Sequence, residues 1–401
     1  MNETPQFAKI ELAQTATRTE AARRQNRFLR LTLGALALFA ATYATLNFAG
    51  RWSAQHQLAE RRLVAFNLLR HDRLEEFITA AREDVQLWSR HPLVVNDARA
   101  FFADWAAMSE NERDAMAREF RPGGQLDTDA TSRTPAERVY IEHYRRLQPE
   151  LLEFIQTHEF YDLFLFTPEG ELAFTVVRES DFGNTIGEAG DPLFETELEA
   201  VASMALASSD PDAVFLSDFA PYAPSAGAMA AFLATPLVDA DGQRLGVFAV
   251  QLNLDIFDDL LTFNEGLGET GFSLVVGEDG RARNSIPLLG EKGLAMRVVP
   301  SNPSLDAAMN GNQASGEMRG GDGVPRFVAA RPLQIAPHNW VVMTEMDVAE
   351  VRRPLWPYLW LYLASLVGIL VSAVLSYRIL RSETRPPRSR GPASADAPRS
   401  D

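Results

Sequence analysis

The sequence contains no cysteine among its 401 residues. This absence excludes disulfide bonds, thiol catalysis and cysteine-ligated metal sites, so the folded parts depend on packing alone. Catalytic motifs are absent as well. The histidines, at positions 56, 71, 91, 143, 158 and 338, show neither HExxH nor HxH spacing, and no GxSxG or phosphate-loop motif occurs. We therefore expect no enzymatic activity, no cofactor and no catalytic metal.

Positive charge is scarce and comes almost entirely from arginine, because Lys9 and Lys292 are the only lysines. The chain has 54 acidic residues against 38 Lys and Arg. Between Leu31 and Tyr377 the counts are 48 and 26, which gives this segment a net charge of −22. Because nucleic acid is bound by basic surfaces, this balance argues against nucleic acid as a partner.

Two segments are apolar over enough residues to cross a membrane, which takes about 20. They are LTLGALALFAATYATLNFAG, within 29–50, and LWPYLWLYLASLVGILVSAVLSY, within 355–378. Arginines precede the first and follow the second. The positive-inside rule thus predicts a two-pass bacterial inner-membrane protein with both termini, from 1–28 and 379–401, in the cytoplasm and 51–354 in the periplasm. A cleaved signal peptide is the alternative for the first segment, but its leader and apolar run are too long for one.

A long helix is predicted directly after the first apolar segment. No proline or glycine occurs between residues 51 and 90, and apolar residues recur at helical spacing from Leu74 to Trp88. We expect this helix to continue out of the membrane and to supply the seam of a homodimer.

Further helices are expected before the first strand. The segment VNDARAFFADWAAMSENERDAMAREF has helical character, and a third helix is signalled by Thr134 as N-cap, Pro135 at the first helical position and Glu137 completing a capping box. Residues 51–159 are therefore expected to form a helical stalk and cover region.

Strand patterns begin at Tyr161 and define a first module over residues 160–265. The strand, turn and strand of YDLFLFTPEGELAFTVV are followed by a loop, by a helix in PLFETELEAVASMALA and by three strands, in VFLSDFAPY, AAFLATPLVD and RLGVFAVQLNL. DIFDDLLTF closes the unit as a short helix. The alternating polarity of the last strand predicts that Gln251 lies on a solvated face of the sheet.

The same order recurs in shorter form over residues 266–354. FSLVVGEDGRARNSI repeats the hairpin, with its turn at Asp279 and Gly280, PSLDAAMNG repeats the helix, and RFVAARPLQ and NWVVMTEMDVAEV repeat the last two strands. Such repetition predicts two tandem αβ modules. Because the second copy leads into the second apolar segment, we expect it to be membrane-proximal and the first copy to be membrane-distal.

This plan resembles the double Cache (PAS-like) sensor domains of bacterial chemoreceptors, sensor histidine kinases and cyclases. The segments YDLFLFTPEGELAFTVVRESDFGNTI, FLSDFAPYAPSAGAMAAFLATPL, GQRLGVFAVQLNL, GLGETGFSLVVGEDG and HNWVVMTEMDVAEV are similar to successive blocks of that family. RARNSI departs from the family pattern, and no HAMP, kinase, cyclase or methyl-accepting segment follows Tyr377. The resemblance implies a membrane-anchored α+β fold with a long N-terminal helix and two antiparallel-sheet modules between two transmembrane helices.

The resemblance also implies a small-molecule pocket between the sheet of the first module and its helix-loop cover. Its candidate ligand-binding residues are Tyr161, Arg178, Asp181, Asp218, Tyr222, Ser225 and Phe232. Arg178 would bind a carboxylate through two parallel hydrogen bonds, and Asp181 or Asp218 would bind an ammonium group. The alternative roles are core packing for Tyr161 and Phe232 and turn capping for the others. An Arg-x-Trp-Tyr cluster, associated with amino-acid-binding members, is absent, so the ligand class stays open.

Three further features have plainer explanations. His71 and Glu75, at i and i+4, are expected to form a surface hydrogen bond rather than a metal site. GLGETG is expected to connect the modules rather than to bind phosphate. Residues 379–401 are expected to be a disordered tail, with a basic segment for anionic lipid or a partner as the alternative.

We expect a chemoreceptor-like periplasmic sensor for signal transduction that lacks its own output module and signals through a partner receptor or kinase. Its ligand would shift the populations of two conformations. One alternative is a non-signalling, membrane-anchored periplasmic binding or scaffold protein. Another is the sensor half of a chemoreceptor or kinase gene that was split or truncated.

Overall fold

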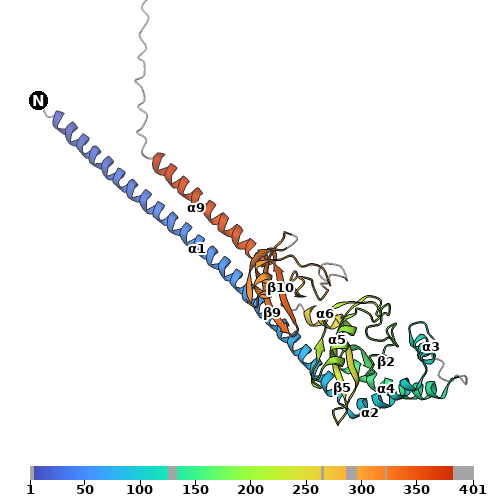
Figure 1. Cartoon of the computed structure of the whole chain (residues 1–401). Coiled ribbons are helices and arrows are strands. Elements are labelled where there is room, and N and C mark those ends of the chain that lie inside the picture. The colour runs from blue at the N-terminus through green and yellow to red at the C-terminus, as the bar shows by residue number, and fades with distance from the viewer. Residues whose placement is uncertain (1–3, 125–132, 263–265, 286–295, 321–322, 383–401) are drawn as a thin grey trace, which may run out of the picture. The chain divides into compact units, whose positions relative to one another are not determined.

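The computed structural model describes residues 4–124, 133–262, 266–285, 296–320 and 323–382 (Figure 1). The chain divides into two compact units, one formed by residues 1–58 with 351–401 and the other by residues 59–350. Helix α1 (Thr4–Ser89) belongs to both. The tail predicted for 379–401 lies, from residue 383 onward, outside the described residues.

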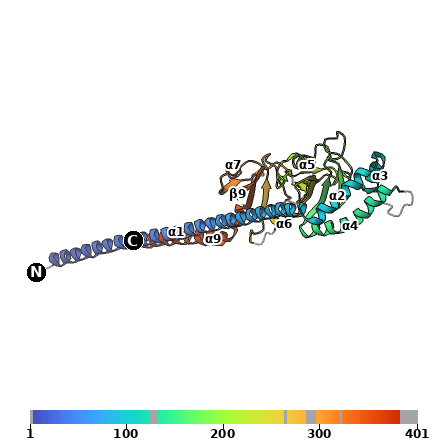
Figure 2. The same ribbon diagram turned by 60° about the horizontal axis from the view of Figure 1, so that its bottom comes forward.

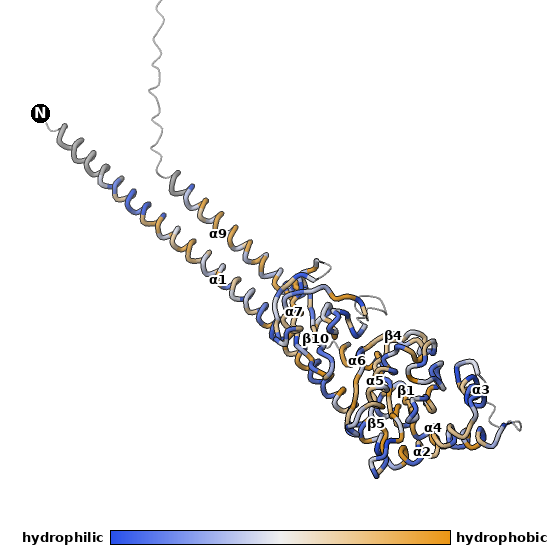
Figure 3. Tube along the Cα trace, in the orientation of Figure 1, coloured by the Kyte–Doolittle hydropathy of each residue, from blue (hydrophilic) through white to orange (hydrophobic). Residues whose placement is uncertain are grey.

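The first unit pairs the N-terminal part of α1 with α9 (Trp356–Ser382), which follows α8 (Val348–Arg352) and the 3-10 turn η2 (Arg353–Leu355). Each long helix contains a stretch long and apolar enough to cross a membrane, and 0% of that stretch is buried in the structure. Apolar residues gather along α9 and the adjoining stretch of α1 (Figure 3). Tyr362 of α9 stacks on Phe48 of α1 with ring centroids 5.2 Å apart.

The second unit begins with three helices that follow α1: α2 (Pro92–Ala107), α3 (Glu110–Phe120) and α4 (Pro135–Thr157). The helical region predicted before residue 121 is therefore two helices. They separate at Ser109, whose backbone N–H donates to Glu112 at 2.6 Å and starts α3. The predicted capping box of α4 is confirmed, because Thr134 and Glu137 each accept a hydrogen bond from the backbone N–H of the other.

The first sheet is antiparallel and has the order β2-β1-β6-β5-β3, with β4 also paired to β5. The strands are β1 (Phe160–Phe166), β2 (Leu172–Thr175), β3 (Phe215–Leu216), β4 (Ala220–Tyr222), β5 (Ala228–Val238) and β6 (Arg244–Asn253). Two helices belong to this module, α5 (Glu197–Ala207) and α6 (Leu254–Thr262). The predicted strand VFLSDFAPY is thus two short strands, with Ser217–Phe219 between them.

Both faces of the first sheet are covered. Phe164 and Phe232 pack on the face of α5, whereas Leu163 and Leu233 pack on the opposite face with residues of α1, α2 and α4. The prediction that Gln251 is solvated is wrong, because its side chain is only 2% exposed. Alternation in a strand separates two faces, but it does not show what covers them.

The second sheet is antiparallel with the order β7-β10-β9-β8. Its strands are β7 (Phe272–Val276), β8 (Ala314–Arg319), β9 (Pro325–Ile335) and β10 (His338–Asp347), and α7 (Pro303–Met309) covers one face. The turn predicted at Asp279 and Gly280 is present, with Gly280 in a left-handed conformation at φ 71°. In the described part of the return segment, residues 281–285, the pairing consists of isolated bridges at Ala282 and Arg281 instead of the expected strand.

Helix α1 joins the two modules within the second unit, where it passes β9 before it reaches α2 and α4 (Figure 2). Its buried residues Leu74, Ile78, Ala81 and Val85 share one core with residues of both sheets. Asn67 donates its side-chain amide to backbone oxygens of β9 and β10, at 3.2 Å to Ala329 and 2.8 Å to Val342. The fold is therefore α+β, with both sheets packed on one helix.

Candidate functional site

A row of residues crosses the first sheet on the side of α5. Asp162 of β1 lies opposite Gln251 of β6, and Gln251 lies opposite Phe232 of β5. The exposed fractions of these side chains are 0%, 2% and 0%. The sheet register therefore places a carboxyl group and an amide inside the first module.

Asp162 is held in place by the strand that pairs with its own. Its Oδ1 accepts the backbone N–H groups of Val176 at 3.0 Å and Val177 at 3.1 Å, and its Oδ2 accepts the Thr175 hydroxyl. Burial raises the pKa of Asp162 to about 8, against the opposing effect of the hydrogen bond from Thr175, and the neighbouring Asp181 raises it further.

The loop after β2 brings two more carboxylates to the same place. Glu179, which is 8% exposed, accepts the Tyr161 hydroxyl at 2.9 Å and the Ser225 hydroxyl. Asp181 is fully buried and its Oδ2 accepts the Tyr222 hydroxyl at 2.5 Å. Burial raises the pKa of Asp181 to about 6, although the hydrogen bond from Tyr222 opposes this change.

The two tyrosines act as donors in this arrangement. Burial and the hydrogen bond to Glu179 raise the pKa of Tyr161 to about 12. Burial and the neighbouring Asp181 raise the pKa of Tyr222 as well. Both hydroxyls therefore stay protonated at neutral pH and donate hydrogen bonds to carboxylates.

We call these neighbouring residues the acidic cluster; its members are Tyr161, Asp162, Thr175, Glu179, Asp181, Tyr222, Ser225 and Gln251. Gln251 joins through its amide nitrogen, 3.4 Å from the Ser225 hydroxyl oxygen. Two buried oxygens, Oδ1 of Asp181 and Oε1 of Gln251, have no hydrogen-bond partner in the part of the chain that the structure describes. The cluster thus holds three carboxyl groups without a basic partner among the described residues; Asp162, with its pKa of about 8, keeps its proton at neutral pH, and Asp181 and Glu179 carry the negative charge.

Four of the predicted site residues, Tyr161, Asp181, Tyr222 and Ser225, belong to the acidic cluster. Phe232 lies beside it in the core, with its ring centroid 4.9 Å from that of Tyr222. The other two predicted residues lie elsewhere. Arg178 is exposed, has a left-handed backbone at φ 63°, and places its guanidinium 5.8 Å from the ring centre of Phe120. Asp218 contacts the second module.

Sequence reasoning missed Asp162, Glu179 and Gln251. The signal for Asp162 was present, since it is the one charged residue in the apolar strand FYDLFLF. Gln251 stands in a similar way within the apolar part of β6, where its polarity was taken as a sign of solvent. Glu179 follows Arg178 directly, and the sharp backbone turn at Arg178 sends the two side chains to different environments.

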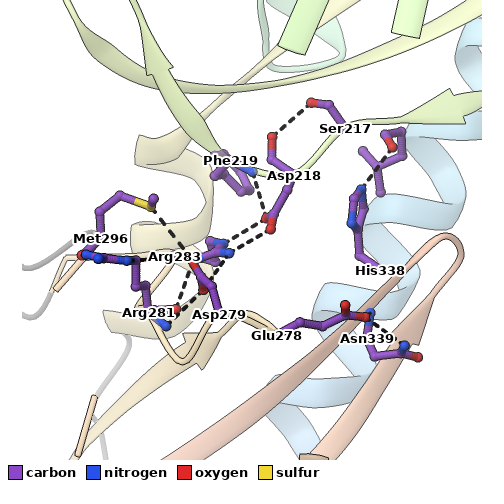
Figure 4. A network of polar contacts seen from close by, with 11 residues as sticks. Ser217, Asp218, Phe219, Glu278, Asp279, Arg281, Arg283, Met296, His338 and Asn339 are labelled. Atoms are coloured by element: carbon purple, nitrogen blue, oxygen red, sulfur yellow. Dashed lines mark hydrogen bonds and ion pairs between the residues drawn. The ribbon is translucent and has the colours of Figure 1, made fainter. Parts of the chain in front are cut away.

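A second polar group lies where the modules meet, and we call it the junction (Figure 4). The Arg283 guanidinium donates to both carboxylate oxygens of Asp218, at 2.7 and 2.6 Å, and lies 2.9 Å from Asp279. Its side chain is 2% exposed. His338 lies 3.0 Å from the carbonyl oxygen of Leu216, on the same stretch of the first module.

The segment 216–225 thus serves two sites. Its first part, with Leu216 and Asp218, contacts the second module at the junction, and its last part contributes Tyr222 and Ser225 to the acidic cluster. The two sites are therefore joined by a short length of chain.

A groove of about 580 Å³ opens to solvent between α2 and the loops at residues 211–212 and 238–242. Its arginines, Arg90 and Arg99, form ion pairs with Asp212 and Asp239 in the same groove. These charges are already paired with one another. The groove therefore offers a ligand fewer unpaired polar groups than the acidic cluster does.

The remaining sequence features have local partners. His71 lies 3.0 Å from Asp72 and 3.9 Å from Glu75, all at the surface of α1. In GLGETG, the backbone N–H groups of Glu269 and Thr270 donate to the carboxylate of Glu350, at 2.8 and 2.9 Å. A carboxylate of the chain itself therefore occupies the place that a phosphate would need.

No protein-family model and no curated protein matches the sequence. Among solved structures, the chain is similar to the ligand-binding domain of the Pseudomonas fluorescens chemoreceptor CtaA with L-alanine, at 17% identity and a TM-score of 0.36, over 70% of this chain and 98% of that one. It is also similar to the ligand-binding domain of the Pseudomonas aeruginosa chemoreceptor PctC with GABA, at 17% identity and a TM-score of 0.35, over 64% of this chain and 95% of that one.

The chain is likewise similar to the ligand-binding domain of the Campylobacter jejuni chemoreceptor Tlp3 with 4-methylisoleucine, at 11% identity and a TM-score of 0.43, over 75% of this chain and 95% of that one. The structures that this chain resembles are thus ligand-binding domains of bacterial chemoreceptors, which are double Cache domains.

Proposed function

We propose that the chain is a membrane-anchored sensor of the double Cache type that binds a small molecule at the acidic cluster of its first module. The observation that carries the proposal is the buried Asp181, whose Oδ1 accepts no hydrogen bond of good geometry among the described residues; the backbone N–H groups of Asp181 and Phe182 lie close enough only to lower its pKa slightly against the effect of burial. An unsatisfied buried oxygen destabilises the folded chain by about 1–3 kcal/mol. A ligand that donates to it recovers this free energy and stabilises the fold.

The signal passes from the ligand to the second module through segment 216–225. A ligand that donates to Oδ1 of Asp181 draws on the same carboxylate whose Oδ2 accepts the Tyr222 hydroxyl, and it thereby shifts the segment that also holds Asp218 at the junction. The second module continues into α8 and α9, which lead to the proposed membrane span. A tenfold population shift requires about 1.4 kcal/mol of differential affinity between two conformations.

The stretches 29–50 and 355–378 span a bacterial inner membrane in this proposal, and residues 51–354 lie in the periplasm. Support comes from the arginines that flank both stretches and from their unburied apolar surface. The homodimer through α1 stays a prediction. Signalling through a partner receptor or kinase stays a prediction as well.

The proposal is tested by thermal unfolding of the full chain in lipid nanodiscs, in the presence of small carboxylates, amines, amino acids and purines. We expect one class of compound to raise Tm, and the Asp181→Asn variant to lose this response. Glu188→Gln, which removes an exposed acid of the same module, is the matched control and keeps the response. A membrane-anchored scaffold instead predicts that none of these compounds changes Tm.

A further inference from the structure

We propose that the ligand of the acidic cluster is a small organic cation, a molecule that carries an amine or a quaternary ammonium group. This inference rests on the proposed function and narrows its ligand. Asp162, Glu179 and Asp181 bring three carboxyl groups together inside the first module, with exposed fractions of 0%, 8% and 0%. Among the residues that the structure describes, no arginine, lysine or histidine forms an ion pair with any of them. Buried carboxylates are normally paired, so a positive charge is what this site lacks.

The hydrogen bonds of the cluster point to the same missing group. Tyr161 and Ser225 donate to Glu179, and Tyr222 donates to Asp181, so these hydroxyl protons are already used. The oxygens that remain without a partner in the described chain belong to Asp181 and Gln251, and both are acceptors. An ammonium group supplies donors and positive charge together.

A single metal ion does not fit this arrangement. Within the described residues, three acidic or histidine side chains bring ligand atoms within 4.8 Å of one another only at His71, Asp72 and Glu75, on the surface of α1. The three carboxylates of the acidic cluster therefore do not converge on one point as ligands of a single ion would. An organic cation is larger and reaches separate carboxylates through several N–H or N–CH₃ groups.

A ligand with its own carboxylate fits less well than a simple amine. Such a group would need a buried cation, and the nearest sequence candidate, Arg178, is exposed beside Phe120. Burial raises the pKa of Asp162 to about 8 and that of Asp181 to about 6, as expected where carboxyl groups lie near each other without a counter-ion. The site thus favours amines over α-amino acids.

Matched pairs of probes test the charge requirement. The full chain in nanodiscs is titrated with choline and its uncharged isostere 3,3-dimethylbutan-1-ol, and with butane-1,4-diamine and butane-1,4-diol, by calorimetry and thermal shift. We expect at least one cation to bind and its neutral counterpart to bind at least about tenfold more weakly, since a hydrogen bond to a charged group contributes about 1.5–3 kcal/mol. If neither cation binds more tightly than its neutral counterpart, the inference is wrong.

Variants assign the binding to the cluster. Asp181→Asn is expected to weaken cation binding by about tenfold or more, whereas Glu188→Gln leaves it unchanged. Tyr222→Phe, which removes only the hydroxyl that contacts Asp181, provides a second variant should Asp181→Asn fold poorly, and it changes the affinity as well. Cation binding that both cluster variants retain would place the site elsewhere and overturn the inference.

The same titrations separate this inference from the proposed function. A neutral or anionic compound that stabilises the chain, with loss of the effect in Asp181→Asn, contradicts the cation and leaves the sensor function in place. If no compound of any class binds, both proposals fail.

Discussion

Asp181 combines full burial with an oxygen that accepts no hydrogen bond from the described residues. Burial raises its pKa to about 6, so the folded chain holds a proton there that the unfolded chain has already released above pH 4. A raised pKa favours the folded state at low pH. This contribution to stability is fully present below the pKa that Asp181 has in the unfolded chain. It is lost as the pH rises through the pKa that Asp181 has in the folded chain.

The ligand-free chain should therefore lose stability as the pH rises from about 4 to about 6, at up to about 1.4 kcal/mol per pH unit from Asp181 alone. Asp181→Asn removes this dependence, because the amide does not titrate. We expect the difference in Tm between Asp181→Asn and the wild type to shift in favour of the variant as the pH rises from 4.5 to 6.5. Glu188→Gln is the control, and parallel Tm curves for Asp181→Asn and wild type would contradict the assignment.

Individual residues show what a sequence reveals about such a site. Tyr222 and Ser225 were predicted because they stand in a block that resembles a sensor family, and both lie in the cluster. Asp162 and Gln251 were missed, although each interrupts an apolar strand. A polar residue at a strand position is ambiguous until the cover of that face is known, because solvent and a buried ligand both satisfy it.

The junction links two irregular elements, the loop after β3 and the hairpin after β7. Arg283 is buried between Asp218 and Asp279, whereas Arg281, on the same hairpin, has a side chain that is 45% exposed. Hydrogen bonds between charged groups stabilise a fold most when they are shielded from water. Arg283 is therefore expected to stabilise the contact between the modules more than Arg281 does.

Arg283→Met keeps the apolar stem and removes the charge, which leaves Asp218 and Asp279 without their shared partner. We expect the free energy of unfolding to fall by about 1.5–3 kcal/mol. The matched change Arg281→Met should alter it by about 0.5 kcal/mol or less. Chemical unfolding of the two variants in detergent measures both values, and equal losses would mean that the junction contributes little.

The sequence predicted some elements better than others. Contacts between residues close in the sequence were easier to predict than contacts between distant residues. The capping box of Thr134 and Glu137 is a local signal, and it was confirmed. The break at Ser109 is also local, with Glu112 three residues later, but the helical pattern on both sides concealed it. Asp218 and Arg283 are 65 residues apart, so their contact depends on tertiary packing that no local pattern reports.

At the scale of the whole molecule, the absence of cysteine makes membrane topology directly measurable. Ala80 lies on the exposed side of α1 within the proposed periplasmic region, and Glu20 lies exposed within the proposed cytoplasmic part. A single cysteine at either position is then the only thiol in the chain.

In intact cells, a membrane-impermeant maleimide should label Ala80→Cys and leave Glu20→Cys unlabelled, because only the periplasm is accessible to it. After the cells are opened, both variants should be labelled. Labelling of Glu20→Cys in intact cells, or protection of Ala80→Cys, would refute the proposed orientation.

The amide of Asn67 fixes the register between α1 and the second sheet. Sliding this helix along β9 and β10 would remove its hydrogen bonds to Ala329 and Val342, and an unpaired buried amide costs about 1–3 kcal/mol. A piston stroke of α1 against the second sheet is therefore disfavoured. Beside the proposed route through segment 216–225, any motion that α1 carries from the first module is expected to turn α1 and both strands as one body, or to bend the helix between Asn67 and the first sheet.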